Sequence, residues 1–289
     1  MYYYYVLNIF LLACINMIAV LGVSIFTGFT GLFSLGHAAF VGIGAYTAGV
    51  LTYHWYVPFP LAILAGMLAS GIAGLVIGIP TLRAKLRSDY FAIAILGFGE
   101  ALRVCLENLS ITNGARGLSL DELSGSAWVV GALLASLAFT RSLLRSRFGA
   151  MFMAIREDPV AAEMAGINLF RTRLLSLVVS AVLCGASGAL LAHRIAFIQP
   201  VMFTMTQSTQ LLASVIAGGM GSISGPAIVS FIFTALPEML RKLEMYRLPA
   251  YGLLLVVIMI FRPQGLMGYR EIPDLLRGTR DLLLARRVR

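Results

Sequence analysis

The stretch LAILAGMLASGIAGLVIG, residues 61–78, contains no charged residue and has a small residue at every fourth position. An apolar run of this length can cross the ~30 Å hydrocarbon layer of a bilayer as an α-helix. Residues four apart share one helix face, so the small residues form a stripe that lets a neighbouring backbone approach closely. The stretch therefore predicts a membrane helix in a tight bundle. The stripe consists of Ala62, Gly66, Ser70, Gly74 and Gly78.

A second apolar run, residues 174–192, carries the same kind of stripe. Its small residues are Ser180, Cys184, Gly188 and Ala192. Because lipid removes the hydrophobic drive between helices, close packing along small residues has to hold such helices together. We therefore interpret both stripes as packing faces and not as the lining of a pore.

The whole chain has the composition of a polytopic membrane protein. It has 289 residues, a mean hydropathy of +0.89 and 12% charged residues. Every backbone polar group must be satisfied inside lipid, so the apolar runs should be helices, and the fold class should be an all-α transmembrane bundle. The seventh run is short and the second is interrupted by glycine, so eight spans are an alternative to nine. The runs are 4–26, 33–51, 59–81, 90–109, 126–144, 174–192, 203–218, 226–240 and 249–262.

The net charge of +9 does not indicate a nucleic-acid partner, because the basic residues are spread between apolar runs and do not form one basic face. Their distribution instead indicates how the chain is oriented in the membrane. Segments 82–89, 141–173 and the tail from 262 together hold 16 of the 22 Lys and Arg residues. The positive-inside rule places these three segments in the cytoplasm. With nine spans the N-terminus faces outward, and its lack of basic residues indicates a retained first span and no cleaved signal peptide.

No catalytic or metal-binding pattern is present in the sequence. Cys14, Cys105 and Cys184 all lie in predicted spans without C-x-x-C spacing, which favours buried thiols. The sequence has no H-E-x-x-H, no G-x-S-x-G and no G-x-x-x-x-G-K-[ST] pattern. We therefore expect no metal site, no enzyme activity and no ATPase site of the P-loop type.

Two glycine-rich stretches, residues 27–46 and 217–229, differ from the packing stripes. Each contains G-x-x-G-x-x-S, as Gly28, Gly31 and Ser34 in the first stretch and as Gly218, Gly221 and Ser224 in the second. Non-helical backbone at membrane depth is tolerated where it is buried in protein or lines a water-filled cavity, and transporters use such breaks to present helix ends to substrate. Two helix boundaries with tight turns are an equally open interpretation.

Two polar positions in predicted spans leave alternatives open. Glu100 and Arg103 lie one helical turn apart and can neutralise each other, as a structural ion pair or as part of a pathway. His37 lies in the first glycine-rich stretch, where hydrogen-bonded packing is favoured over a role as a ligand.

The segment MAIREDPVAAEMAGINLFRTR, residues 153–173, is charged in an otherwise apolar chain. Asp158 is a good N-cap, Pro159 suits the first helical position, and Gly166 can end the helix, which predicts a helix of one to two turns. The connection 145–173 is longer than the 2–8 residues that usually join helices. Two purposes fit: contact with a soluble motor, or an interfacial helix on anionic lipid.

Residues 160–166 resemble the EAA-x-x-x-G motif of ABC importer permeases, with Val160 where that motif has Glu. The wider AIREDPVAAEMAGIN resembles the coupling loop of the branched-chain amino acid (Liv-type) permeases, and the likeness is closest to the LivM-like members. Further segments resemble that family in the same order, and together they cover residues from about 16 to 268. They are TGFTGLFSLGHAAFVGIGAYTA (27–48), LRSDYFAIAILGFGE (86–100), GGMGSISGP (218–226) and FRPQGLMG (261–268).

This resemblance implies a permease domain at 1–268, with a cytoplasmic coupling loop at 145–173, in a bacterial inner membrane. The implied partners are a sister permease, two ABC ATPase subunits that hydrolyse ATP, and an extracytoplasmic substrate-binding protein; this chain itself would bind no cofactor. The coupling helix would dock into an ATPase through polar contacts and close approach. The docking residues would be Arg156, Glu157, Asp158 and Glu163 for polar contacts, and Ala161, Ala162 and Gly166 for close approach.

The expected substrates are branched-chain or related amino acids, and urea or short amides are an alternative because related systems share much of the pattern. An ion-coupled secondary transporter is the rival class, with Glu100 as its only intramembrane acid. The basic tail, residues 269–289, is expected to lie on anionic lipid. The candidate pathway residues are Gly28, Thr30, Gly31, Ser34, His37, Glu100, Gly218, Gly219 and Ser222.

Overall fold

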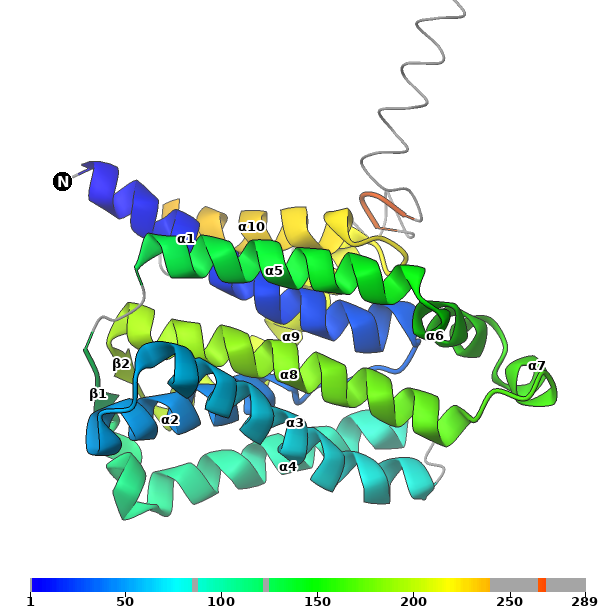
Figure 1. The fold of residues 1–289 in the computed structure, drawn as a ribbon, viewed down its shortest axis with the longest axis horizontal. Helices are drawn as coiled ribbons and strands as arrows, with labels where there is room; N and C mark the ends of the chain where they lie inside the picture. Colours follow the sequence, from blue (N-terminus) through cyan, green and yellow to red (C-terminus); the bar gives the residue numbers. More distant parts are fainter. Residues whose placement is uncertain (1, 85–87, 122–124, 240–264, 269–289) are drawn as a thin grey trace, which may run out of the picture.

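A computed structural model describes residues 2–84, 88–121, 125–239 and 265–268 of the chain. The described elements are nearly all helices, and the long ones run along the long axis of the molecule (Figure 1). The elements are α1 Tyr2–Val23, a π-helical segment Ser24–Phe29, α2 His37–Trp55, α3 Phe59–Arg83, α4 Ser88–Asn108, short 3-10 helices at Ser110–Thr112 and Gly114–Arg116, β1 Leu118–Ser119, α5 Ser126–Arg145, α6 Arg147–Glu157, α7 Pro159–Met164, α8 Leu169–Ile195, β2 Phe197–Ile198, a 3-10 helix Pro200–Met202, α9 Met205–Gly218 and α10 Ser224–Met239.

Four of the described helical stretches are long and apolar enough to cross a membrane: Tyr4–Phe29, Phe59–Arg83, Ser126–Arg145 and Leu169–Ile195. The helices α2, α4, α9 and α10 coincide with four further predicted spans, which confirms an all-α, multi-pass membrane protein. The predicted span 249–262 lies outside the described residues. A total of eight or nine spans therefore stays a prediction.

The bundle is built around α8, which packs against α1, α2 and α3. The small-residue stripe of α3 is buried, as the sequence predicts, and it faces α8. A Cβ on Gly74 would lie 3.0 Å from the Cβ of Ala181, and one on Gly78 would lie 2.8 Å from Leu177 Cδ2. Glycine at these positions therefore sets how closely α3 and α8 approach each other.

The predicted stripe of α8 is also buried, but it faces α1 and α2 instead of α3. A Cβ on Gly188 would overlap the carbonyl oxygen of Val41 on α2, and a Cβ on Gly22 of α1 would lie 3.3 Å from Cys184 Sγ. A second stripe on α8, which we did not predict, faces α3. It consists of Ala181, Gly185 and Ala189, and a Cβ on Gly185 would overlap the Ser70 hydroxyl.

The two ends of the bundle are built differently, as Figure 1 shows. At one end, called the α7 end, lie α6, α7 and the connection between α1 and α2. At the other end β1 and β2 form a two-stranded antiparallel sheet in which Leu118 pairs with Ile198. This sheet ties the chain after α4 to the chain after α8.

The described helices differ from the predicted spans in two places that matter for the site. The second span was expected from residue 33, but α2 begins at His37 because the chain before it is non-helical. The connection 145–173 contains an additional helix, α6, whose Phe152 and Ile155 are buried; Phe152 packs in a cluster with Ile25, Phe29 and Leu183. The charged residues of α6 stand only at its two ends, and the uncharged residues between them contain the buried face that the sequence analysis missed.

We expect Gly188→Ala to destabilise the protein by about 1–3 kcal/mol, because the new methyl group must displace the α2 backbone at Val41. Thermal unfolding of the purified chain in detergent measures the effect. Gly131→Ala on α5 is the matched control, since nothing lies within 4 Å of a Cβ at that position. An unfolding temperature for Gly188→Ala equal to that of the wild type would contradict the packing assignment.

Candidate functional site

The chain between α1 and α2 is broken inside the bundle. After α1 comes the π-helical segment Ser24–Phe29, and residues 30–36 are non-helical although Leu32, Ser34 and Gly36 are buried. Gly31 has a φ of +80°, a conformation that favours glycine. The first glycine-rich stretch is therefore a break in the helical backbone that is buried in part, since Gly31 and Phe33 are exposed. It agrees with the interpretation that expects non-helical backbone here.

The second glycine-rich stretch is a tight turn between helices, as the other interpretation predicts. Helix α9 ends at Gly218, Gly219 has a φ of +112°, and α10 begins at Ser224. The hydroxyl of Ser222 accepts a hydrogen bond from the backbone N–H of Gly225 at 3.2 Å. Two N–H groups of the segment 265–268 donate to the end of α9: Leu266 to the Ala217 carbonyl at 2.9 Å and Met267 to the Gly218 carbonyl at 3.2 Å.

Arg156, near the end of α6, joins the two glycine-rich stretches. Its Nη1 donates to the carbonyl of Gly28 at 2.8 Å and to the carbonyl of Met220 at 3.0 Å. A Cβ on Gly28 would lie 2.9 Å from the Met220 oxygen, and a Cβ on Gly31 would lie 3.1 Å from Arg156 Cγ. We call the group of Gly28, Gly31, Arg156 and Met220 the Arg156 junction. Its glycines allow a charged donor to reach backbone carbonyls of two separate segments.

Helix α7 follows Arg156 after only two residues and has the predicted caps. The carboxylate of Asp158 accepts hydrogen bonds from Val160 N at 2.8 Å and Ala161 N at 3.1 Å. Gly166 ends the helix with a φ of +86°. Both ends of this short helix are therefore fixed by local hydrogen bonds and backbone geometry.

The surface of α7 is unusual for a segment outside the apolar spans. Val160 is 70% exposed and Met164 is 87% exposed, one helical turn apart, whereas Ala162 is buried. The remaining residues predicted to dock, apart from Arg156, are exposed around this apolar pair. They are Glu157, Asp158, Ala161, Glu163 and Gly166.

His37 begins α2 and is fully buried. Its Nε2 lies 2.8 Å from the Ser180 hydroxyl of α8, and the N–H of Ala38 donates to the Ser208 hydroxyl of α9 at 3.0 Å. This geometry is the hydrogen-bonded packing that the sequence favours for His37. Thr30 also bonds internally, to the Ile25 carbonyl at 3.0 Å, whereas the buried Ser34 hydroxyl has no hydrogen-bond partner within the described part of the chain.

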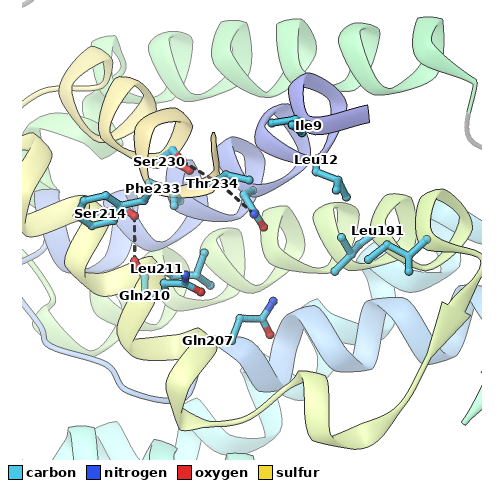
Figure 2. Close-up of a pocket in the computed structure, with 13 residues that line it drawn as sticks. Ile9, Leu12, Leu191, Gln207, Gln210, Leu211, Ser214, Ser230, Phe233 and Thr234 are labelled. Atoms are coloured by element: carbon cyan, nitrogen blue, oxygen red, sulfur yellow. Dashed lines mark hydrogen bonds between the residues drawn. The ribbon is translucent and has the colours of Figure 1, made fainter. Parts of the chain in front are cut away.

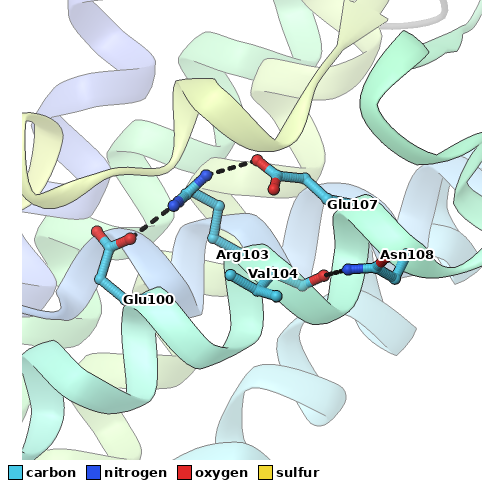
Figure 3. Close-up of polar contacts among 5 residues, drawn as sticks. All are labelled: Glu100, Arg103, Val104, Glu107 and Asn108. Atoms are coloured by element: carbon cyan, nitrogen blue, oxygen red, sulfur yellow. Dashed lines mark hydrogen bonds and ion pairs between the residues drawn. The ribbon is translucent and has the colours of Figure 1, made fainter.

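Glu100 pairs with Arg103 at 2.9 Å, as their spacing predicts, and Arg103 also pairs with Glu107 at 2.6 Å (Figure 3). All three side chains belong to α4 and are partly exposed. The pairing therefore stabilises one helix and joins no second helix to it. The structure does not bring Glu100 to the Arg156 junction or to the cavity described next.

A cavity of about 220 Å³ lies between α1, α8, α9 and α10 (Figure 2). None of the candidate pathway residues named from the sequence lines it. The sequence analysis missed this cavity, although the sequence holds two signals of it. Gln207, Gln210 and Ser214 share one face of α9, and Asn16 is an amide in the middle of an apolar helix. The polar lining consists of Asn16, Gln207, Gln210, Ser214, Ser230 and Thr234.

Comparison with known proteins places these features in a family of transport proteins. A family model described as branched-chain amino acid transport system / permease component matches residues 5–262. The high-affinity branched-chain amino acid transport system permease protein LivM of Escherichia coli K12 is 34% identical, over 89% of this chain and 68% of the relative.

More distant relatives show the same pattern. The permease protein LivH of Salmonella typhimurium is 29% identical over 59% of this chain and 62% of the relative. A probable LivM protein of Methanocaldococcus jannaschii is 28% identical over 73% of this chain and 70% of the relative. No solved structure gives a significant match.

We expect Arg156→Met to loosen both glycine-rich stretches, because two partly buried carbonyls lose a charged donor at a cost of roughly 1–3 kcal/mol. Hydrogen exchange of the purified protein should be about tenfold faster or more in residues 24–31 and 217–222. Arg147→Met, an exposed arginine of the same helix, is the control and should leave both segments unchanged. Equal exchange in Arg156→Met and the wild type would contradict the junction.

Proposed function

The chain belongs to the family of permease components of branched-chain amino acid transport systems, and from this premise we propose that it is one of two permease subunits of an ABC importer. ATPase subunits would bind α7 and move the helices through the Arg156 junction. The main support for this proposal is the position of Arg156. Its side chain donates hydrogen bonds to carbonyls in both helix breaks, and only two residues separate it from α7, an exposed short helix.

The exposed surface of α7 supports a docked partner over contact with lipid. An amphipathic helix that lies on a membrane presents a long apolar face with basic residues beside it. Helix α7 has only six residues, presents Val160 and Met164, and has Glu157, Asp158 and Glu163 around them. Anionic lipid would repel these carboxylates, whereas a groove with basic residues on an ATPase would attract them.

The junction supports transmission of movement from α7 into the membrane. Arg156 is bonded to Gly28 in the π-helical segment that follows α1 and to Met220 in the turn that follows α9. A displacement of α6 and α7 must therefore either move these two segments or break the two bonds. Arg156, which the sequence analysis assigned to the ATPase contact, then acts inside the permease. The exposed docking residues keep the role expected for them, whereas Ala162 is buried within the chain and is not available for the close approach expected of it.

The proposed orientation places the α7 end in the cytoplasm, in agreement with the distribution of basic residues. Eight or nine spans, a coupling loop at 145–173 and a lipid-bound tail at 269–289 belong to this proposal. The extracytoplasmic binding protein would then face the β1–β2 end. The sister permease would resemble the LivH relatives, and the membrane would be the bacterial inner membrane.

The transported substrates would be branched-chain amino acids, as the names of the relatives state for those proteins. The chain would hydrolyse no ATP itself, since its sequence lacks a P-loop. A transporter of urea or short amides would use the same kind of permeases and ATPases with another binding protein. Competition between leucine and urea or a short amide in one uptake assay separates these two substrate classes.

The direct test is reconstitution of the chain in liposomes together with a sister permease, ATPases and binding protein encoded by neighbouring reading frames. We expect uptake of labelled leucine that needs ATP inside the liposomes and the binding protein on the side opposite α7. Uptake by this chain alone, driven by a proton or sodium gradient without ATP, would contradict the proposal and support an ion-coupled transporter.

We expect Met164→Asp to weaken binding of the ATPase subunits at least about tenfold, because a carboxylate would replace the most exposed apolar group of α7 in a desolvated contact. Co-purification and ATPase activity of the complex measure the loss. The matched control is Val201→Asp, a 61% exposed apolar residue near β2 at the other end of the bundle. ATPase binding by Met164→Asp as strong as in the wild type, with the protein inserted in the membrane, would remove α7 from the interface.

A further inference from the structure

We propose that the cavity between α1, α8, α9 and α10 binds the transported molecule, and that its lining selects amino acids with uncharged aliphatic side chains. This inference rests on the proposed function, because it locates the site at which that transporter would bind its amino acid. The argument depends on three properties of the cavity: its polar groups, its lack of charge and its position along α9.

The polar groups of the cavity come from three helices and leave an acceptor unused. Asn16 Nδ2 donates to the Thr234 hydroxyl at 3.1 Å, and the Thr234 hydroxyl donates to the Ser230 carbonyl at 2.9 Å. Gln207 Oε1 is buried and has no hydrogen-bond partner within the described part of the chain. Figure 2 shows the Gln207 side chain extending from α9 into the space between the helices. An ammonium group is a donor that would satisfy this oxygen.

Amides and hydroxyls suit both ends of a zwitterion. Each amide offers N–H donors for a carboxylate and an oxygen for an ammonium group, and hydroxyls can serve either. Because the ligand brings equal and opposite charges, a lining of neutral dipoles can satisfy it without a protein counterion. The carboxylate of the ligand would take its hydrogen bonds from amide and hydroxyl donors of α1 and α9.

The other half of the cavity fits an aliphatic side chain. Leu12, Leu191, Leu211 and Phe233 contribute apolar surface. None of the 13 residues that line the cavity is charged, so a lysine, arginine, aspartate or glutamate side chain would be desolvated there without a counterion. The volume of about 220 Å³ leaves room for a molecule as small as one amino acid.

The position of the cavity connects it to the Arg156 junction. Ser214 lines the cavity, and Gly218 follows it one turn later on α9. The Gly218 carbonyl accepts a hydrogen bond from Met267 N. Two residues after Gly218 comes Met220, whose carbonyl accepts a hydrogen bond from Arg156. Leu191 and Ile195 place the cavity at the end of α8 that leads into β2, away from α7. A movement of the junction would therefore reach the cavity through less than two turns of a single helix.

The first test is binding of labelled leucine to the purified complex of both permeases and the ATPases, without binding protein or nucleotide. We expect leucine, isoleucine and valine to compete, and lysine and glutamate not to compete. Gln207→Leu should weaken leucine binding about tenfold, because the buried acceptor for the ammonium group is lost. Thr209→Val, on the exposed side of the same helix, should bind as the wild type does.

The second test does not depend on the choice of amide substitution. In a chain whose three cysteines, Cys14, Cys105 and Cys184, are replaced by alanine, Gln210→Cys should react with a water-soluble thiol reagent, and leucine should slow this reaction. Thr209→Cys should react at the same rate with and without leucine. Protection of position 210 by leucine but not by lysine supports the assignment.

The outcomes separate this inference from the proposed function. A wild-type complex without ATP-driven leucine uptake would overturn the proposed function. A complex that does take up leucine, but in which Gln207→Leu binds leucine as tightly as the wild type and leucine does not protect Gln210→Cys, would overturn only the assignment of this cavity. Equal competition by lysine would overturn the proposed selectivity.

Discussion

A broken helix inside a membrane protein leaves backbone carbonyls that need a donor, and in this chain a single guanidinium supplies it for two separate breaks. The Gly28 and Met220 carbonyls both accept from Arg156, and the end of α9 receives two further donors from residues 265–268. An unsatisfied group of this kind costs about 1–3 kcal/mol in the interior of a protein. The same bonds that make the breaks tolerable therefore tie them to the segment that leads into α7.

The rest of the fold acts as a rigid frame around this connection. Helix α8 has small residues on two faces, which hold α3 on one side and α1 and α2 on the other at distances that admit no larger side chain. Helix α9 is shorter than these helices, ends at a glycine turn and packs against α1, α2 and α10. In the proposed function, ATPase subunits would act on α7, Arg156 would transmit the movement, and α9 would carry it to the cavity. Substrate and ATPases would then shift the same conformational equilibrium from opposite ends of α9.

The sequence predicted the framework of the fold well, and the physical reasons are local. Helix caps at Asp158 and Gly166, the α3 stripe and the apolar runs are set by residues next to one another along the chain. The same holds for Glu100 and Arg103, whose spacing alone brings them together. These features do not depend on which helices become neighbours in the bundle.

Features that depend on tertiary contacts were missed. The inward direction of Arg156 follows from two glycines 128 and 125 residues earlier in the chain, and no local pattern reveals such a contact. The cavity needs Asn16 of α1 beside Thr234 of α10, which only the packing order of the helices determines. Helix α6 was hidden because its buried face contacts the end of α1 instead of lipid. The second α8 stripe was not predicted, because each of its residues directly follows a residue of the first stripe in the sequence.

The central claim is that Arg156 transmits movement from α7 to α9. Spin labels on α6 at Met153 and on α9 at Thr209, both exposed positions, allow the distance between these helices to be measured in the assembled complex with and without ATP. The account predicts a distance that changes when ATP binds, and a change that is lost in Arg156→Met although the ATPases remain bound. An unaltered, ATP-dependent change in Arg156→Met would show that α9 is moved by another route and would contradict the account.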